Sequence, residues 1–333
     1  MVLNIPLCLI VFSGICISAS AKTKIVYPSG QGRLTQYKDL KDHPQKSKTY
    51  NEFWTYHFSL NGNMQVILNY SRADLGKLKS PVCGSDLSII GFKGKTYTVA
   101  REYPRAKFKF SDDKQQLNVH ENIWFKGALP GEHQVYFKTK KKDIFYFIDL
   151  RFTDIVPGMT WGDGVFKLGS EKVGVFIHIP RAKVDGTIII NTDTVKVSGL
   201  GYMDHTFQTN MGPKIARTGY RYHSTGAEIN IGYLLQATSK YGSGWLGFGL
   251  VEKEGNLTLI RPKAIKINTA KKTRKIKVPT DMEITYGLQT VSFKHSKDLQ
   301  HLSVLNEFKG VTKWAVKKFM GGGKLFTSAA PAL

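Results

Sequence analysis

Hydrophobic and polar side chains alternate with a period of two along most of this chain. In residues 64–70 every second side chain, from Met64 to Tyr70, is apolar, while Gln65 and Asn69 between them are polar. Successive side chains of a β-strand point to opposite faces, so this pattern predicts strands with one buried face. The same alternation, or a dense run of β-branched and aromatic residues, predicts strands in residues 143–152, 173–179, 187–197, 228–236, 245–251 and 281–286.

Short turn sequences separate the predicted strands, such as Asn-Gly-Asn at 61–63, Asp-Gly at 185–186 and Glu-Gly-Asn at 254–256. Many short strands at regular spacing are typical of β-sandwiches and β-barrels. We therefore expect an all-β fold. A boundary near residues 157–170 would divide the chain into two β-rich halves, residues 22–163 and residues 164–333.

One segment near the C-terminus has helical periodicity instead. Apolar residues at 308, 311, 315 and 319 fall on one side of a helix, and lysines at 309, 313 and 317 fall on the opposite side. Three glycines at 321–323 end this predicted helix, which spans residues 308–320. A basic amphipathic helix can lie on an anionic membrane or pack against a barrel, and we prefer packing.

The N-terminus has the features of a signal peptide. Residues 3–17 are almost all apolar, but the run is shorter than the roughly 20 residues that a membrane span needs. It ends in Ala19-Ser20-Ala21, the small-x-small pattern of a cleavage site. We expect residues 1–21 to be removed and the protein to be exported; a retained anchor is the alternative. Cys83 is the one cysteine outside this segment, so no internal disulfide is expected.

The chain is strongly basic, with 48 Lys and Arg against 25 Asp and Glu, a net charge of +23. Such a charge attracts anionic partners. The basic residues are scattered, however, and no known nucleic-acid-binding motif accompanies them. We therefore expect no nucleic-acid partner, and we leave peripheral contact with an anionic membrane open.

Common catalytic and metal motifs are missing from the sequence, which has no GxSxG, HExxH, CxxC or Walker loop. The densest polar segment is residues 199–207. In a strand, Tyr202 and Asp204 share one face and His205 points to the other. A phenol beside a carboxylate in an apolar interior could be an acid/base pair, because burial raises the pKa of a carboxyl. A structural hydrogen-bonded cluster explains the same residues.

Two further segments could contribute to a site. His178 ends an apolar strand, and it would join an acid/base site only if it faced Tyr202 and Asp204. In the N-terminal half, Glu52, Trp54 and Tyr56 share one parity of a predicted strand. Large aromatics on an inward face either fill a core or line an apolar pocket.

These segments resemble a superfamily of tandem lipocalin-like proteins that includes carotenoid hydratases, fungal cyclases and the yeast survival-factor family. Residues 52–56 are similar to its Glu-Trp-Trp-Tyr-like strand, and residues 178–188 to a strand with a Pro-Arg step followed by Gly-Thr-Ile. Gly-Leu-Gly-Tyr-Met-Asp-His at 199–205 matches the hydratase branch. Residues 210–214, 221–222 and 313–319 are similar to the survival-factor branch.

The resemblance implies two lipocalin-like antiparallel β-barrels in tandem, with the C-terminal helix added and an apolar ligand cavity inside. It also implies that a Tyr, an Asp and an upstream His transfer a proton to an alkene. The matching positions here are Tyr202, Asp204 and His178. The residues that we expect to bind the ligand are Glu52, Trp54, Tyr56, Trp124, Trp161, Arg181 and His205. No metal or cofactor is expected.

Two functions are compatible with these residues. We slightly prefer a carrier of a long apolar lipid, such as an isoprenoid or a sphingolipid-like molecule. The alternative is an alkene hydratase, isomerase or cyclase that uses the Tyr202–Asp204 pair as its acid/base group. A structural or adhesive role driven by charge ranks third. The sequence does not determine the oligomeric state.

Overall fold

The computed structural model describes residues 25–47, 49–76, 80–127, 129–223, 228–273, 276–287, 289–294, 297–303 and 324–329. The predicted signal peptide, residues 1–21, and the predicted helix, residues 308–320, lie outside the described residues. Most of what is described is β-strand, which confirms the all-β class. Within these ranges, no helix has both the length and the apolar character needed to cross a membrane.

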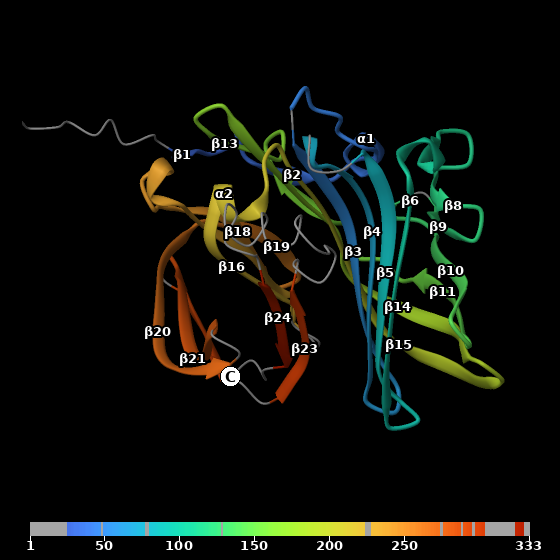
Figure 1. The fold of residues 1–333 in the computed structure, drawn as a ribbon. Helices are drawn as coiled ribbons and strands as arrows, with labels where there is room; N and C mark the ends of the chain where they lie inside the picture. Colours follow the sequence, from blue (N-terminus) through green and yellow to red (C-terminus); the bar gives the residue numbers. More distant parts are fainter. Residues whose placement is uncertain are drawn as a thin grey trace, which may run out of the picture.

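A sheet of fifteen strands forms the larger part of the fold (Figure 1). Its hydrogen-bonded order is β6-β5-β4-β3-β15-β14-β11-β10-β9-β8-β7, and β1, β2, β12 and β13 join it beside β14. The strands of this sheet are β1 (Ile25–Val26), β2 (Gly32–Leu34), β3 (Tyr50–Leu60), β4 (Met64–Asp74), β5 (Val82–Phe92), β6 (Lys95–Pro104), β7 (Lys109–Ser111), β8 (Gln116–His120), β9 (Ile123–Lys126), β10 (His133–Lys141), β11 (Ile144–Thr153), β12 (Met159–Trp161), β13 (Val165–Leu168), β14 (Glu171–Ile190) and β15 (Asp193–Gln208).

Three smaller antiparallel sheets follow in the chain and lie on the other side of the molecule in Figure 1. The first contains β16 (Ala216–His223), β17 (Asn230–Ala237), β18 (Trp245–Lys253) and β19 (Asn256–Ile260). The others contain β20 (Pro262–Thr273), β21 (Ile276–Tyr286) and β22 (Gln289–Lys294), and then β23 (Lys297–Ser303) and β24 (Lys324–Ala329). The described helices are short: α1 (Tyr37–Leu40), α2 (Gly212–Ile215) and the 3-10 turns η2 (Arg105–Lys107) and η3 (Ser239–Tyr241).

The two longest strands, β14 and β15, form a hairpin that links the two predicted halves. The C-terminal part of β14 pairs with β11, and its N-terminal part pairs with β12 and β13. Along its C-terminal part, β15 pairs with β3. Strands from the predicted second half therefore continue the sheet of the first half. The boundary that we expect near residues 157–170 stays a prediction.

The largest sheet does not close into a barrel within the described residues, because its end strands β6 and β7 do not pair. Side chains bridge the gap instead. The rings of Tyr103 in β6 and His120 in β8 stack with their centroids 4.5 Å apart, and Lys141 of β10 donates to the carbonyl oxygen of Ala100 in β6. The prediction of closed barrels in tandem is thus not confirmed.

Aromatic side chains fill the interior that this curved sheet encloses. Trp54, Tyr56, Phe58, Phe125 and Phe152 are all fully or almost fully buried there. Interiors of proteins are close-packed, so rings of this size leave little space for a guest molecule. This packing bears directly on the choice between a carrier and an enzyme.

A second apolar core lies between the β14–β15 hairpin and the four-stranded sheet. Val175 and Ile177 of β14 and Tyr202 of β15 pack there with Phe248 and Leu250 of β18. The hairpin therefore separates two cores, with alternate side chains entering each. The candidate functional residues of β15 lie on these two faces.

Candidate functional site

Tyr202 and Asp204 lie two residues apart on β15 and share the face toward the second core, as the alternation predicts. The hydroxyl of Tyr202 donates a hydrogen bond of 2.7 Å to Oδ2 of Asp204. Both side chains are buried, Asp204 completely. The alternation thus correctly placed these two side chains on one face of the strand.

Arg221 of β16 completes the contacts of this carboxyl. Its Nε lies 3.2 Å from Oδ2 of Asp204, the oxygen that also accepts the Tyr202 hydrogen bond. The other oxygen, Oδ1, is buried and has no hydrogen-bond partner among the described residues. Burial raises the pKa of Asp204, while Arg221 and Tyr202 pull in the opposite direction with smaller effects.

Two histidines surround the ring of Tyr202. His223 of β16 stacks on it, with centroids 4.8 Å apart, and His57 of β3 lies edge-on at 6.0 Å. Burial lowers the pKa of His57 well below its ordinary value, and the neighbouring His223 adds to this. A cavity of about 10 Å³ adjoins these rings, and this volume is enough for about one water molecule. Its lining residues are His57, Ser59, Pro180, Arg181, Leu200, Gly201, Tyr202 and His223.

His178 does not face Tyr202 and Asp204, so it does not join the acid/base cluster. It is buried on the opposite face of the hairpin, where its ring lies 5.9 Å from the ring of His205. The pairing of Ile177 with Asp204 places position 177, not 178, on the side of the carboxyl. Burial lowers the pKa of His178 well below its ordinary value.

The opposite face of β15 carries a second polar cluster around His205. Its Nε2 lies 3.0 Å from Oε1 of Glu52, and its Nδ1 lies 2.9 Å from the carbonyl oxygen of Asp39. The main-chain N–H of His43 donates to the same Glu52 oxygen at 2.7 Å. Burial acts to raise the pKa of Glu52, but the hydrogen bonds from His205 and His43 outweigh it and lower the pKa to about 2.

Trp54 and Tyr56 fill the first core and do not line a cavity described here. The Trp54 indole N–H donates to the carbonyl oxygen of Leu40 at 2.9 Å, and its ring stacks on His205. The Tyr56 hydroxyl lies 2.8 Å from Nε2 of His133. Both residues have ring contacts and hydrogen bonds that a structural role requires.

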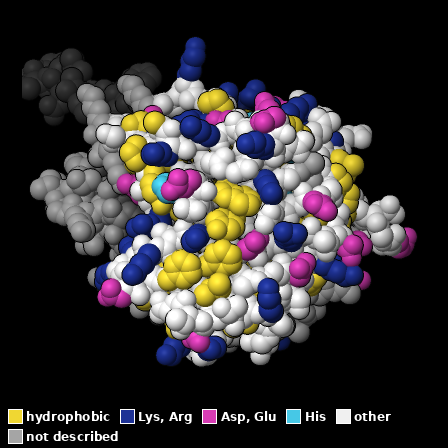
Figure 2. Space-filling model, turned by 90° about the vertical axis from the view of Figure 1, so that its right-hand side faces the viewer, with side chains coloured by type: hydrophobic (Ala, Val, Ile, Leu, Met, Phe, Trp, Pro, Cys, Tyr) yellow, Lys and Arg dark blue, Asp and Glu magenta, His cyan; other side chains and the backbone are white. Residues whose placement is uncertain are grey.

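The remaining expected ligand-binding residues lie apart from one another. Trp124 is on the outer face of β9, where its ring stacks on that of Tyr136 with the centroids 4.8 Å apart. Figure 2 views the molecule from the right-hand side of Figure 1 and shows hydrophobic side chains near the centre of that side. Trp161 is half-buried at the end of β12, 4.9 Å from the guanidinium of Arg261. Arg181 lies 3.7 Å from Glu252 and lines the small cavity beside Tyr202.

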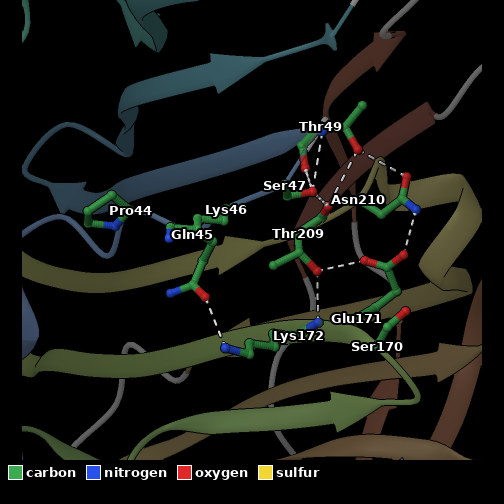
Figure 3. A pocket seen from close by; sticks show the side chains of 10 residues that line it. All are labelled: Pro44, Gln45, Lys46, Ser47, Thr49, Ser170, Glu171, Lys172, Thr209 and Asn210. Carbon is green, nitrogen blue, oxygen red and sulfur yellow. Dashed lines mark hydrogen bonds between the residues drawn. The ribbon is translucent and has the colours of Figure 1, made fainter.

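A larger cleft of about 780 Å³ lies where the segment before β3 meets the start of β14 and the end of β15 (Figure 3). Its walls are mostly polar. Glu171 accepts hydrogen bonds from Thr209 and Asn210, and Lys172 donates to Gln45. These side chains bind one another, and the lining is unlike that of an apolar lipid pocket.

Three residues of the Tyr202 cluster were not predicted from the sequence: His57, Arg221 and His223. His57 and His223 lie on strands that are far apart in the chain, and their rings are 4.9 Å apart. The alternation of side chains within β3 and β16 shows which residues of each strand share a face. The packing of those strands against β15 depends on the tertiary fold. No local motif would have found them.

Comparisons with known proteins agree with this fold. The sequence matches no protein-family model and no curated protein. Among solved structures, a Nitrosomonas europaea protein described as a candidate AttH is similar, with a TM-score of 0.61 and 12% identity over 92% of this chain and 97% of that one. Kievitone hydratase from Nectria haematococca has a TM-score of 0.51 and 10% identity, covering 85% of this chain and 89% of its own.

A third similar structure is CghA with Sch210972, which has a TM-score of 0.56 and 10% identity over 85% of this chain and 86% of that one. At such low identities the similarity establishes a shared fold and nothing about activity. The chain therefore shares its overall fold with these three structures.

Proposed function

We propose that this protein is an enzyme that transfers a proton to an alkene, with hydration, isomerisation or cyclisation as the outcome. The observation that carries the proposal is the buried Tyr202–Asp204 hydrogen bond of 2.7 Å, with Oδ1 of the same carboxyl left without a partner. One of the structures that share the fold is named a hydratase, which supports this class.

The contacts of Asp204 indicate where its proton is held. Oδ2 already faces two donors, the Tyr202 hydroxyl and Nε of Arg221. A protonated carboxyl has one O–H donor, so the proton is favoured on Oδ1. Because burial raises the pKa of Asp204, the acid form is retained to a higher pH than in water.

The same contacts suit the reaction that follows. Asp204 gives its Oδ1 proton to an alkene carbon, which leaves a carbocation on the substrate and a carboxylate on the enzyme. Tyr202 and Arg221 then stabilise this carboxylate through Oδ2. Addition of water to the cation and return of a proton to Asp204 give hydration. Transfer of a proton from a neighbouring carbon to the Asp204 carboxylate gives isomerisation. Attack by a second double bond, followed by transfer of a proton from the new cation to Asp204, gives cyclisation.

The substrate class is an isoprenoid-like alkene, because the apolar second core surrounds the acid. The cavity beside Tyr202 has a volume of about 10 Å³, so a substrate must displace side chains that line it. Strands β14 and β15 pair with β11 and β3 of the first half, and the acid lies on the face of this hairpin toward the second core.

Carriage of a long apolar lipid has less support from the described residues. Aromatic rings fill the first core, and the cleft of about 780 Å³ has a mostly polar lining. Neither of the two cavities described above is both apolar and large enough for such a ligand. We therefore place the enzyme ahead of the carrier, which reverses the order preferred from the sequence.

The proposal is tested by incubating the protein in D₂O with acyclic carotenoids, linear terpene alcohols and prenylated phenols. Mass spectrometry should detect deuterium in a hydrated or isomerised product. Asp204→Asn should lower the rate by roughly 10²–10⁴-fold, the usual contribution of a general acid. Asp86→Asn is a matched control, because burial also raises the pKa of Asp86, and that residue lies on β5 away from Tyr202. Equal rates for both variants would contradict the proposal.

A further inference from the structure

We propose that His43, Glu52 and His205 form a binding site for a divalent transition-metal ion such as Zn²⁺. This site lies on the opposite face of β15 from the proposed acid, so it is independent of the proposed function. The ligand atoms of the three residues lie within 4.8 Å of one another.

The contacts of His205 place a positive charge, either a second ring proton or a metal ion, between its Nε2 and Glu52. A neutral imidazole has one N–H donor and one acceptor nitrogen. Nδ1 of His205 faces the carbonyl oxygen of Asp39 at 2.9 Å, which can only accept, so this nitrogen carries the N–H. In the neutral ring, Nε2 then presents a lone pair to a Glu52 oxygen only 3.0 Å away, whereas in the protonated ring it donates to that oxygen. Two acceptors at this distance repel each other unless a cation lies between them.

The arrangement is one that metal-binding histidines commonly adopt. A histidine that binds a metal usually donates its other ring N–H to a carbonyl or carboxylate, which fixes the ring and its tautomer. The carbonyl of Asp39 has this role for His205. Two imidazoles and one carboxylate form a donor set that Zn²⁺ accepts, with a fourth position left for water.

The distances also suit a small metal ion. Nδ1 of His43 lies 3.5 Å from Oε1 of Glu52, and Nε2 of His205 lies 3.0 Å from it. Ligand atoms about 2.0–2.1 Å from a tetrahedral metal are separated by about 3.3 Å, and the two observed distances lie on either side of this value. The ligand atoms of the two histidines lie within 4.8 Å of each other.

Unsatisfied polar atoms provide a second, independent observation. Nδ1 of His43 and Oε2 of Glu52 are buried atoms that have no hydrogen-bond partner in the described part of the chain, and Glu52 is fully buried. Buried polar atoms normally have a partner. Nε of Arg72 lies 3.6 Å from Oε2, beyond hydrogen-bond distance, and Nη1 of Arg72 bonds Asp42. The His43 side chain keeps 22% of its surface exposed, which gives an ion access from solvent.

The test uses tag-free protein that has been dialysed against a chelator and then titrated with Zn²⁺ in a calorimeter. We expect one equivalent to bind saturably, and Co²⁺ to give the intense visible bands of a tetrahedral site. His43→Ala should weaken binding about tenfold or more, whereas His120→Ala, which removes a half-buried histidine of β8, should bind as the unmodified protein does.

His43 precedes β3 and donates to Glu52 through its main chain, so His43→Ala keeps that hydrogen bond, and circular dichroism verifies its fold. His43→Gln is a second variant with a polar side chain of similar length. The absence of saturable Zn²⁺ binding by the unmodified protein would mean that a proton alone lies between Glu52 and His205, and it would overturn the proposal. Equal affinities for His43→Ala and His120→Ala would do the same.

Discussion

Asp204 and His205 are consecutive residues of β15, yet their side chains lie on opposite faces of the sheet and in different clusters. Asp204 accepts a hydrogen bond from Tyr202 in the second core, whereas His205 contacts Glu52 beside the first core. One strand thus supplies the proposed acid on one face and the proposed metal ligand on the other.

The raised pKa of Asp204 predicts a pH-dependent difference in stability. The folded protein holds the Asp204 proton more tightly than the unfolded chain does. The stability that this protonated carboxyl contributes is therefore complete below the ordinary pKa of 3.8, and it is lost as the pH rises through the pKa of Asp204 in the folded protein. Asp204→Asn has no carboxyl to ionise. Its free energy of unfolding, relative to the unmodified protein, should therefore increase from pH 3.8 toward neutrality. Urea denaturation over this range measures the difference, and a flat difference would refute the raised pKa.

Tyr202→Phe should change the acid without removing it. Because the Tyr202 hydrogen bond lowers the pKa of Asp204, its loss should raise that pKa further. The infrared band of the protonated carboxyl should then persist to higher pH than in the unmodified protein. The variant should also lose about 1–3 kcal/mol of stability, since Asp204 loses a buried hydrogen bond. Unchanged carboxyl titration would show that the hydroxyl does not influence Asp204.

His133 predicts a loss of stability in acid. Burial lowers its folded pKa to about 3, so the folded protein keeps this imidazole neutral while the unfolded chain binds a proton near pH 6.5. Its contribution is complete above pH 6.5 and is lost as the pH falls through about 3, at up to about 1.4 kcal/mol per pH unit. In His133→Gln, the amide oxygen can still accept a hydrogen bond from the Tyr56 hydroxyl. The free energy of unfolding of this variant should therefore fall less steeply in acid than that of the unmodified protein. His120→Gln is the control, and an equally shallow fall in that variant would contradict the assignment.

Trp54 and Trp124 should differ sharply when each is replaced by alanine. Trp54 is fully buried in the first core, so Trp54→Ala should cost about 3–5 kcal/mol. Trp124 lies on the outer face and contacts Tyr136 and Lys126, so Trp124→Ala should cost about 1 kcal/mol. Chemical denaturation of both variants measures the costs. A small cost at Trp54 would point to a ligand cavity instead of a packed core.

The sequence predicted those features that depend on one strand at a time. Alternation gave the all-β class, and it correctly placed Tyr202 and Asp204 on one face with His205 on the other. It could not place His178, because its position relative to Asp204 depends on the register between β14 and β15, which shifts between Ile177 and Ile179. A period of two fixes the faces of a single strand and leaves the pairing with its neighbours open.

The proposed metal site could not be predicted either, because it also depends on the pairing of neighbouring strands. Glu52 and His205 were both expected to bind a ligand, but no metal was expected. His43, Glu52 and His205 form no motif with a fixed spacing. They meet because β3 pairs with β15 and places Glu52 directly opposite Phe207, within reach of His205. The barrel prediction was limited in a similar way, since closure depends on whether β6 and β7 meet.

The position of β15 between two cores limits how its sequence can change. Replacing one side chain on this strand affects one cluster, so either cluster can vary separately. Inserting or deleting a single residue before position 202 would turn every later side chain to the other face and exchange the polar groups of the two clusters. Relatives of this protein should therefore accept many substitutions in this strand, while length changes should be confined to the turns at its two ends.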